Sequence, residues 1–450
     1  METAIVIVFI LGYLAITLEH SLKIDKLIPA LAMMSICWAL VAFGIDGFDT
    51  WFSSHGGDDG KGAILDGFGA LGSDVKHHIL ESSLLHHLGK TAEILVFLLG
   101  AMTIVEITDH FDGFATIKRF VKTNKKVVLL WIISFLAFVL SAIIDNLTAT
   151  IVLITILRKL LSDSNDRMWF AGMIIVAANA GGAWSPIGDV TTTMLWMQEL
   201  VTTEKLISML LLPSLVCMLI PTIIASFLPA FKGNFEPIED EKQPTNLSAF
   251  MFILGLTAII FVPIFKTVTH LPPYLGMMLS LAIVAMVAEI VSARRFDMSH
   301  VTSEHTHNSP VHGALGKIEM PSILFFLGIL MGVAALESLG LLFEFAGMLN
   351  KSMPNKDVVV LLLGGGSAVI DNVPLVAASM GMFTEGTDDS LWHFIAYAAG
   401  TGGSMLIIGS AAGVVAMGME RISFFWYMKR ISLLALVGYL AGAAVFYFMK

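Results

Sequence analysis

Residues 141–150 read Ser-Ala-Ile-Ile-Asp-Asn-Leu-Thr-Ala-Thr, and residues 367–374 repeat the pattern as Ser-Ala-Val-Ile-Asp-Asn-Val-Pro. Each motif places an Asp-Asn pair inside a long apolar segment. Further along the chain, the stretch 181–189 (Gly-Gly-Ala-Trp-Ser-Pro-Ile-Gly-Asp) is matched by 402–410 (Gly-Gly-Ser-Met-Leu-Ile-Ile-Gly-Ser). The same motifs occur in the same order in both halves, which predicts an internal repeat.

The composition places this repeat in a membrane. The chain has 450 residues, of which 56% are hydrophobic and 14% charged, whereas soluble domains average roughly 25% charged residues. About 20 apolar residues cross a bilayer as a helix. The apolar segments are 2–19, 24–44, 91–109, 127–157, 168–198, 206–230, 247–265, 273–293, 319–340, 357–383, 391–420 and 431–449. We therefore expect an all-α polytopic membrane protein. The absence of a dense basic tract argues against nucleic-acid binding.

The distribution of Lys and Arg predicts an orientation. Placing residues 20–26 in the cytoplasm puts 18 of the 26 basic residues in cytoplasmic loops and both termini outside, as the positive-inside rule requires. The alternation works only if segments 127–157 and 357–383 each enter and leave on the same side. Each is therefore predicted to be a re-entrant helical hairpin, and the two hairpins open to opposite sides.

The predicted architecture is two inverted-topology repeats. The first covers 1–230, with its broken helix at 168–198, and the second covers 247–450, with its broken helix at 391–420; residues 231–246 form a cytoplasmic linker. Glycine lets a helix unwind and proline removes a backbone donor. The expected break residues are Gly181, Gly182, Pro186, Gly188, Gly402, Gly403 and Gly409. In transporters built from inverted repeats, such breaks meet at a midplane binding site.

Carboxylates at this depth need a partner. A charged side chain at the bilayer centre costs about 2.5–3.5 kcal/mol on insertion scales, and the motif segments offer no Lys or Arg in their apolar parts. Protons and hard cations such as Na⁺, which prefer oxygen ligands, are the expected companions. The candidate ion- and proton-binding residues are Asp145, Asn146, Thr148, Asn179, Ser185, Asp189, Thr191, Thr192, Ser367, Asp371, Asn372, Ser404 and Ser410.

Competition between H⁺ and Na⁺ for one carboxylate would suffice for exchange. Asp145, Asn146 and Asp189 are the predicted Na⁺ ligands, with Asp371 in support, because Ser410 replaces the second-half counterpart of Asp189. No other metal and no cofactor is expected. Glu93 and Glu106 lie in an apolar helix and are candidate proton relays.

These motifs resemble the NhaD-type sodium/proton antiporters of the broad ion-transporter superfamily. The resemblance extends over nearly the whole chain and rests on 141–150, 179–193 and 367–374. It implies Na⁺(Li⁺)/H⁺ exchange in a bacterial inner membrane. It also implies a homodimer in which a transport domain moves against a scaffold in an elevator-like manner.

Three other classes stay open at this point. A Na⁺-coupled carboxylate or other anion carrier of the same superfamily would use the same fold, with helix N-termini facing the anion; the acidic tips argue against it. A membrane-embedded enzyme is disfavoured because the chain has no His-Glu-x-x-His, Gly-x-Ser-x-Gly or phosphate-loop motif. A pH-gated channel is a third possibility.

Overall fold

The computed structural model describes most of the chain. The described residues are 1–17, 23–53, 63–65, 67–120, 123–158, 160–235, 245–296, 309–318, 320–342, 348, 355–369 and 372–450. Asp371, predicted to support the ion site, lies outside them.

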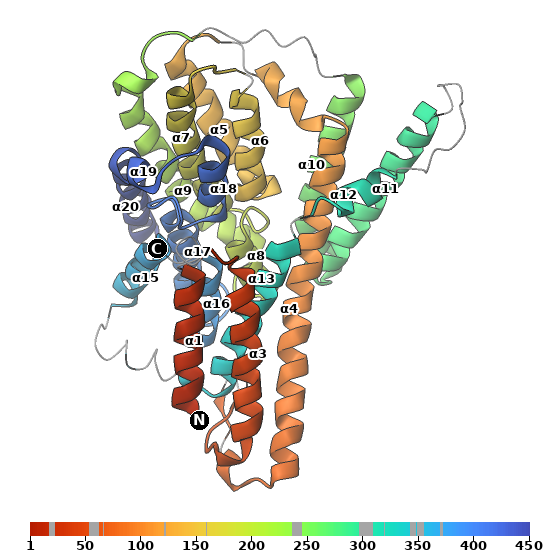
Figure 1. Ribbon diagram of the computed structural model, residues 1–450, viewed down its shortest axis with the longest axis vertical. Coiled ribbons are helices and arrows are strands. Elements are labelled where there is room, and N and C mark those ends of the chain that lie inside the picture. Colours follow the sequence, from red (N-terminus) through yellow and green to blue (C-terminus); the bar gives the residue numbers. More distant parts are fainter. Residues whose placement is uncertain are drawn as a thin grey trace.

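Helices make up nearly all of this structure (Figure 1). In the first half they are α1 (Glu2–Thr17), α3 (Leu27–Gly44), η1 (Ile45–Gly47), η2 (Phe68–Ala70), α4 (Ser73–His110), η3 (Gly113–Phe120), α5 (Lys126–Ile144), α6 (Asn146–Arg158), α7 (Ser164–Gly182), α8 (Val190–Met197), α9 (Thr203–Ser226) and η4 (Pro229–Phe231). In the second half they are α10 (Asn246–Thr269), α11 (Pro273–Phe296), α12 (Pro310–Leu315), α13 (Met320–Ser338), α15 (Lys356–Gly366), α16 (Asn372–Met382), α17 (Ser390–Gly402), α18 (Ala411–Glu420), α19 (Phe424–Arg430) and α20 (Ser432–Met449). The short strands β1 (Phe52–Ser53) and β2 (Ala63–Ile64) form an antiparallel pair.

Eight helices within the described ranges are long and apolar enough to cross a membrane. Their outward faces are apolar as well: Ile253 and Ile264 on α10 and Met286 on α11 are all more than half exposed. An apolar outer surface of this kind suits lipid. The prediction of an all-α polytopic membrane protein is confirmed.

The helices form two packed groups. The α4 group consists of α1, α3, α4 and α10 to α13, and the α7 group consists of α5 to α9 and α15 to α20. In Figure 1, α5 to α7 lie on one side of the long orange α4 and α11 lies on the other. The two groups meet where α16 contacts α13, where α5 contacts α10 and where α8 contacts α4. Of these helices, α16 begins at the candidate ion-binding residue Asn372 and α8 begins directly after Asp189.

The apolar segments 24–44 and 91–109 leave residues 45–90 between them as a predicted loop, and this prediction is wrong in its second part. There α4 begins at Ser73 and continues for 38 residues to His110, about 57 Å at 1.5 Å per residue, well beyond a hydrocarbon core of about 30 Å. Eleven of the 18 residues in 73–90 carry polar side chains. Hydropathy registers only the apolar end of such a helix, so the sequence reading missed its polar extension.

Both halves are interrupted at the motif residues. In the first half, α5 and α6 pack together around Asp145, and residues 183–189 separate α7 from α8. In the second half, residues 403–410 separate α17 from α18. These positions lie within the predicted segments 127–157, 168–198 and 391–420.

Glycine makes the same close contacts at both interruptions. A Cβ at Gly181 would lie 2.2 Å from the carbonyl oxygen of Phe138, and one at Gly402 would lie 2.1 Å from that of Gly364. A Cβ at Gly182 would lie 2.6 Å from the Gly188 carbonyl oxygen, and one at Gly403 would lie 2.6 Å from that of Gly409. Matched backbone contacts support a structural repeat, while its inverted orientation stays a prediction.

These contacts predict a large stability loss for Gly181→Ala. The added methyl would collide with backbone, which moves less readily than a side chain, so a cost of about 3 kcal/mol or more is expected. Gly365→Ala is the matched control, because Gly365 has nothing within 4 Å of an added Cβ. The melting temperature of detergent-solubilised protein, followed by size-exclusion chromatography, would report both. Equal melting temperatures would contradict the packing argument.

Candidate functional site

Asp189 is the N-cap residue of α8 and is 2% exposed. Its Oδ1 accepts hydrogen bonds from the backbone N–H of Thr191 at 2.9 Å and from Thr191 Oγ1 at 2.8 Å. The chain is extended at Asp189, with φ −148° and ψ 147°, as N-cap residues typically are. The free N–H groups and the dipole of a helix N-terminus favour a negative charge there. The break in the first half thus holds a buried carboxylate.

The other carboxylate oxygen of Asp189 accepts a hydrogen bond from the asparagine of each Asp-Asn pair. Asn146 Nδ2 donates to Asp189 Oδ2 at 2.6 Å, and Asn372 Nδ2 donates to the same atom at 3.2 Å. Asn146 begins α6 and Asn372 begins α16, so they come from different halves of the chain. One carboxylate therefore joins the two helix starts that follow the Asp-Asn motifs.

Asn179 extends the network to the second broken helix. Its Oδ1 accepts from Asn146 Nδ2 at 3.1 Å, while its Nδ2 donates to Ser404 Oγ at 3.0 Å and to Ser410 Oγ at 2.9 Å. Ser410 is the N-cap of α18, as Asp189 is of α8. All of these side chains are buried. Carboxylate, amides and hydroxyls from both halves thus form one connected polar cluster, which we call the Asp189 network (Asn146, Asn179, Asp189, Asn372, Ser404 and Ser410).

Asp145 occupies the turn between α5 and α6. Its backbone has φ 73° and ψ 160°, a conformation that is rare for any residue other than glycine and costs on the order of 1–3 kcal/mol. Thr148 holds the carboxylate through its N–H at 2.8 Å and its Oγ1 at 2.9 Å. The turn fixes the direction of the Asp145 side chain independently of the Asp189 network.

Both carboxylates line a cavity of about 90 Å³ between the two groups of helices, which we call the Asp145 cavity. Its remaining wall is mainly apolar and includes Phe97 on α4 and Phe325 on α13. Such a wall excludes bulk water and makes the electrostatic interactions of a bound ion stronger. A small cation or a proton is the species that two carboxylates with nearby amide and hydroxyl oxygens can hold.

Three predicted ligands, Ser185, Thr192 and Ser367, donate their hydroxyls to backbone carbonyls. Ser367 Oγ donates to the Ala399 carbonyl at 2.9 Å, and Ser141, which is its first-half counterpart and not a predicted ligand, donates to the Ala178 carbonyl at 2.5 Å. Ser185 Oγ donates to the Ala142 carbonyl at 2.5 Å and Thr192 Oγ1 to the Asp189 carbonyl at 2.9 Å. These hydroxyls fix the positions of the interrupted helices, whereas their oxygens lie outside the Asp189 network.

The two candidate relay residues lie along α4. Glu93 is close enough to Lys266 for its charge to act on that ammonium group. Glu106 also has an interaction partner. Neither residue lines the Asp145 cavity.

Sequence reasoning missed Lys26. Its Nζ lies 4.5 Å from the centre of the Phe325 ring, a cation–π distance, and the residue lines the Asp145 cavity. Lys26 precedes α3 in a short basic loop, where its charge looked like an ordinary topology signal. Only the packing of α3 against α13 brings it to the cavity.

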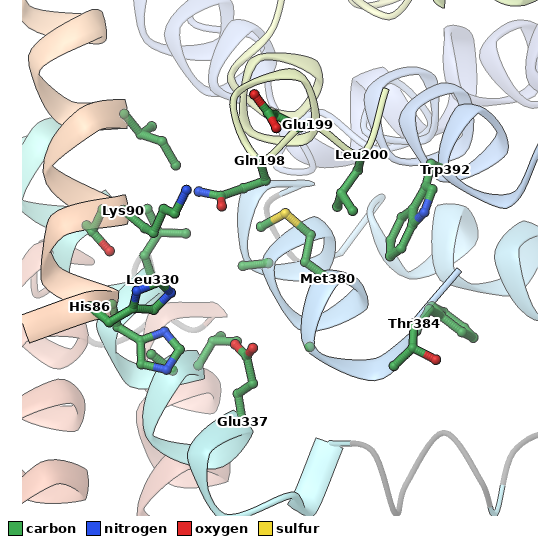
Figure 2. Close-up of a pocket in the computed structure, with 18 of the residues that line it drawn as sticks. His86, Lys90, Gln198, Glu199, Leu200, Leu330, Glu337, Met380, Thr384 and Trp392 are labelled. Atoms are coloured by element: carbon green, nitrogen blue, oxygen red, sulfur yellow. The ribbon is translucent and has the colours of Figure 1, made fainter. Parts of the chain in front are cut away.

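A second and larger cavity of about 650 Å³ also lies between the groups, and we call it the Glu337 cavity. Figure 2 shows Glu337 of α13 pointing into it, with His86 and Lys90 of α4 nearby and Gln198 and Glu199 above. Six of its lining residues carry ionisable side chains: His86, His87, Lys90, Glu199, Glu337 and Glu385. The cavity is thus wide and polar, in contrast to the narrow and apolar Asp145 cavity.

Interrupted helices around a buried polar network, in a bundle of membrane-length helices, define a secondary transporter and not an enzyme. A family model described as a citrate transporter matches residues 5–391. The chain belongs to this citrate transporter family.

Its relatives narrow the comparison. Sodium/proton antiporter 1 of Arabidopsis thaliana is 39% identical, over 99% of this chain and 72% of the relative. The Na(+)/H(+) antiporter NhaD of Alkalimonas amylolytica is 29% identical, over 97% of this chain and 88% of the relative. The crystal structure of the Alcanivorax borkumensis YdaH transporter, described as having an unusual topology, is similar with a TM-score of 0.57 at 14% identity, covering 93% of this chain and 97% of that one. That last likeness concerns the fold.

Proposed function

We propose that the chain is a Na⁺(Li⁺)/H⁺ antiporter in which Na⁺ and H⁺ compete for Asp145 and Asp189. The observation that carries the proposal is the Asp189 network beside Asp145, because it places two carboxylates and several neutral oxygens in one small cavity. The antiporter names of relatives that align along nearly the whole chain support it.

Na⁺ binding requires oxygen ligands. Asn146 and Asn372 both present their NH₂ groups to Asp189. Rotation of either amide about its last side-chain bond would present the carbonyl oxygen instead. Each amide can then offer its oxygen to a protonated carboxyl group or to a bound cation, and its NH₂ group to a carboxylate that has bound neither. The same side chains could therefore stabilise each state of the site as H⁺ and Na⁺ compete for it.

The sidedness of the proposal follows from the basic loops. With Lys26 in the cytoplasm and both termini outside, the Asp145 cavity faces the cytoplasm and the Glu337 cavity faces the exterior of a bacterial inner membrane. Cytoplasmic Na⁺ would leave in exchange for external protons. The α7 group, which holds the Asp189 network, would be the moving part and the α4 group the scaffold, in an elevator-like cycle within a homodimer.

Everted membrane vesicles with a preformed proton gradient test the proposal. Addition of Na⁺ or Li⁺ should collapse the gradient, whereas K⁺, citrate and succinate should have little effect. The measurement is the recovery of a pH-sensitive dye at several values between about pH 7 and pH 9.5, because a coupled pair of carboxylates titrates in more than one step. No response to Na⁺ at any of these values would reject antiport.

The second candidate is a Na⁺-coupled carboxylate carrier. The description of the family as a citrate transporter favours it, as does the ammonium group of Lys26 at the cavity. Against it, Asp145 and Asp189 line the same cavity and would repel an anion. A gradient collapse that needs citrate or succinate together with Na⁺ would establish this alternative.

Lys26→Gln separates the two candidates. Removing a positive charge from the cavity should lower the KM for Na⁺ by about three- to tenfold, since one charge at short range in a partly solvated site changes a binding energy by about 1 kcal/mol. A carboxylate carrier should instead show a higher KM for its anion. Lys23→Gln is the control, because Lys23 is an exposed lysine of the same loop. An unchanged KM for Na⁺ would show that Lys26 does not act on the ion.

A further inference from the structure

The two cavities follow one another along the same helices. On α4, residues up to Ile94 line the Glu337 cavity and residues from Phe97 line the Asp145 cavity. On α13, which runs the opposite way, Phe326 lines the Asp145 cavity and Leu330 the Glu337 cavity. The two cavities are therefore successive parts of one interface between the α4 and α7 groups.

The layer between them is thin. The last lining residue of one cavity and the first of the other are three or four positions apart on α4, α13 and also α16, where Val373 and Ala377 mark the change. At 1.5 Å per residue this separation is about 5–6 Å, or one helical turn. Only one layer of side chains separates the carboxylates of one cavity from the polar wall of the other.

Trp196 is the largest side chain of α8 in this layer. Thr193, one turn before it, lines the Asp145 cavity, and Gln198, just after it, lines the Glu337 cavity. Trp196 itself is 1% exposed. Its ring meets Phe97 of α4 edge to face, with 6.4 Å between ring centroids. The indole thus closes the layer between α8 and α4.

Lys266 of α10 fixes this indole from the other group of helices. Its Nζ donates to the carbonyl oxygen of Trp196 at 2.8 Å and lies 4.6 Å from the centre of the Trp196 ring. The carbonyl belongs to the C-terminal end of α8, where a cation is favoured by the helix dipole. Glu93 and Glu199 supply negative charge around the ammonium group, and Lys90 supplies a further positive charge.

We infer that Trp196 is the barrier between the two cavities and that Lys266 is the positioning residue that holds it closed. The inference rests on the proposed function only in that the cavities form the path of a cation. A narrow apolar constriction stops ions by excluding water. Removing the indole would join the two cavities and let cations pass without exchange for protons.

Trp196→Ala in proteoliposomes is the test. With no pH gradient and the membrane potential clamped by K⁺ and valinomycin, downhill ²²Na⁺ uptake should rise about tenfold over wild type, as expected when a dewetted constriction opens. Trp196→Phe should keep uptake low. Lys266→Gln should raise ²²Na⁺ uptake less, about threefold on the same reasoning. Lys266→Arg keeps the positive charge and should keep uptake at the wild-type level.

Trp169→Ala is the matched control, because Trp169 is a buried tryptophan of α7 that packs on Phe231 and Trp426 and lines neither cavity. It should lower stability without a leak. Wild-type uptake in both Trp196→Ala and Lys266→Gln, with exchange still coupled to protons, would overturn the inference. Failure of the wild-type protein to exchange Na⁺ for H⁺ would instead reject the proposed function, so the two failures are distinguishable. If Trp196→Ala does not fold, ²²Na⁺ uptake in Lys266→Gln alone tests the inference: increased uptake would support the barrier, and wild-type uptake would overturn it.

Discussion

Asp189→Asn is expected to abolish Na⁺-driven proton movement while the protein still folds and reaches the membrane. The amide can replace the carboxylate at the helix N-terminus, because its oxygen can accept from Thr191 as Asp189 Oδ1 does. Its NH₂ group would then face Asn146 and Asn372, whose amides would have to rotate to offer it oxygen. Rotation of Asn146 gives up its hydrogen bond to Asn179 Oδ1, and an unsatisfied buried polar group costs about 1–3 kcal/mol. The neutral amide also leaves no charge to balance Na⁺.

Exchange should fall at least about 100-fold, since the change removes a binding charge worth several kcal/mol in a site of low dielectric constant. The measurement is the Na⁺-dependent collapse of a proton gradient, normalised to the amount of protein in the vesicles. Asp163→Asn is a close control: Asp163 also caps a helix, α7, and accepts from a backbone N–H two residues on, but it is exposed and remote from the network. Equal loss in both variants would assign the effect to capping.

Asp145→Asn is the second variant expected to lose exchange, again by about 100-fold or more, because a neutral side chain at membrane depth can neither release a proton nor balance a cation. Its fold should be retained, since an amide oxygen can still accept from Thr148. Direct Na⁺ binding by calorimetry in detergent, together with the vesicle assay, would separate lost binding from blocked movement.

Asp112→Asn is the matched control for this variant. Asp112 is another aspartate with a positive φ, 54°, and it is exposed and lines neither cavity. Exchange should persist in Asp112→Asn at the wild-type rate. If Asp145→Asn retained exchange while Asp189→Asn lost it, Asp189 alone would carry both ions.

The sequence predicted the helices and their interruptions because the signals are local. Charged and glycine-rich motifs inside apolar segments mark positions where a membrane helix cannot continue undisturbed, and the structure interrupts the chain at 145 and at 183–189. The weight given to Asp189 over Ser410 came from the same local comparison. The roles of these residues in transport stay predictions.

The partners of each residue were beyond such reasoning. That Asn146 and Asn372 donate to one oxygen of Asp189 depends on how the two halves pack. Ser185 and Thr192 looked like equal ligands because a hydroxyl in sequence does not reveal whether it faces an ion or a carbonyl. Lys26 was missed for the same reason, since α13, which brings Phe325 to it, lies far along the chain.

At position 145, the backbone conformation lowers the stability of the fold, while the aspartate side chain is the one that transport is proposed to need. Glycine would adopt φ 73° and ψ 160° without strain, so a laboratory selection for heat tolerance would favour replacing this aspartate. A selection for growth in salt would restore it. A thermostabilising library that must preserve transport should therefore keep codon 145 fixed. In a library that varies this codon, the enrichment of glycine under heat alone would measure how much stability the protein loses by holding the Asp145 carboxylate in place.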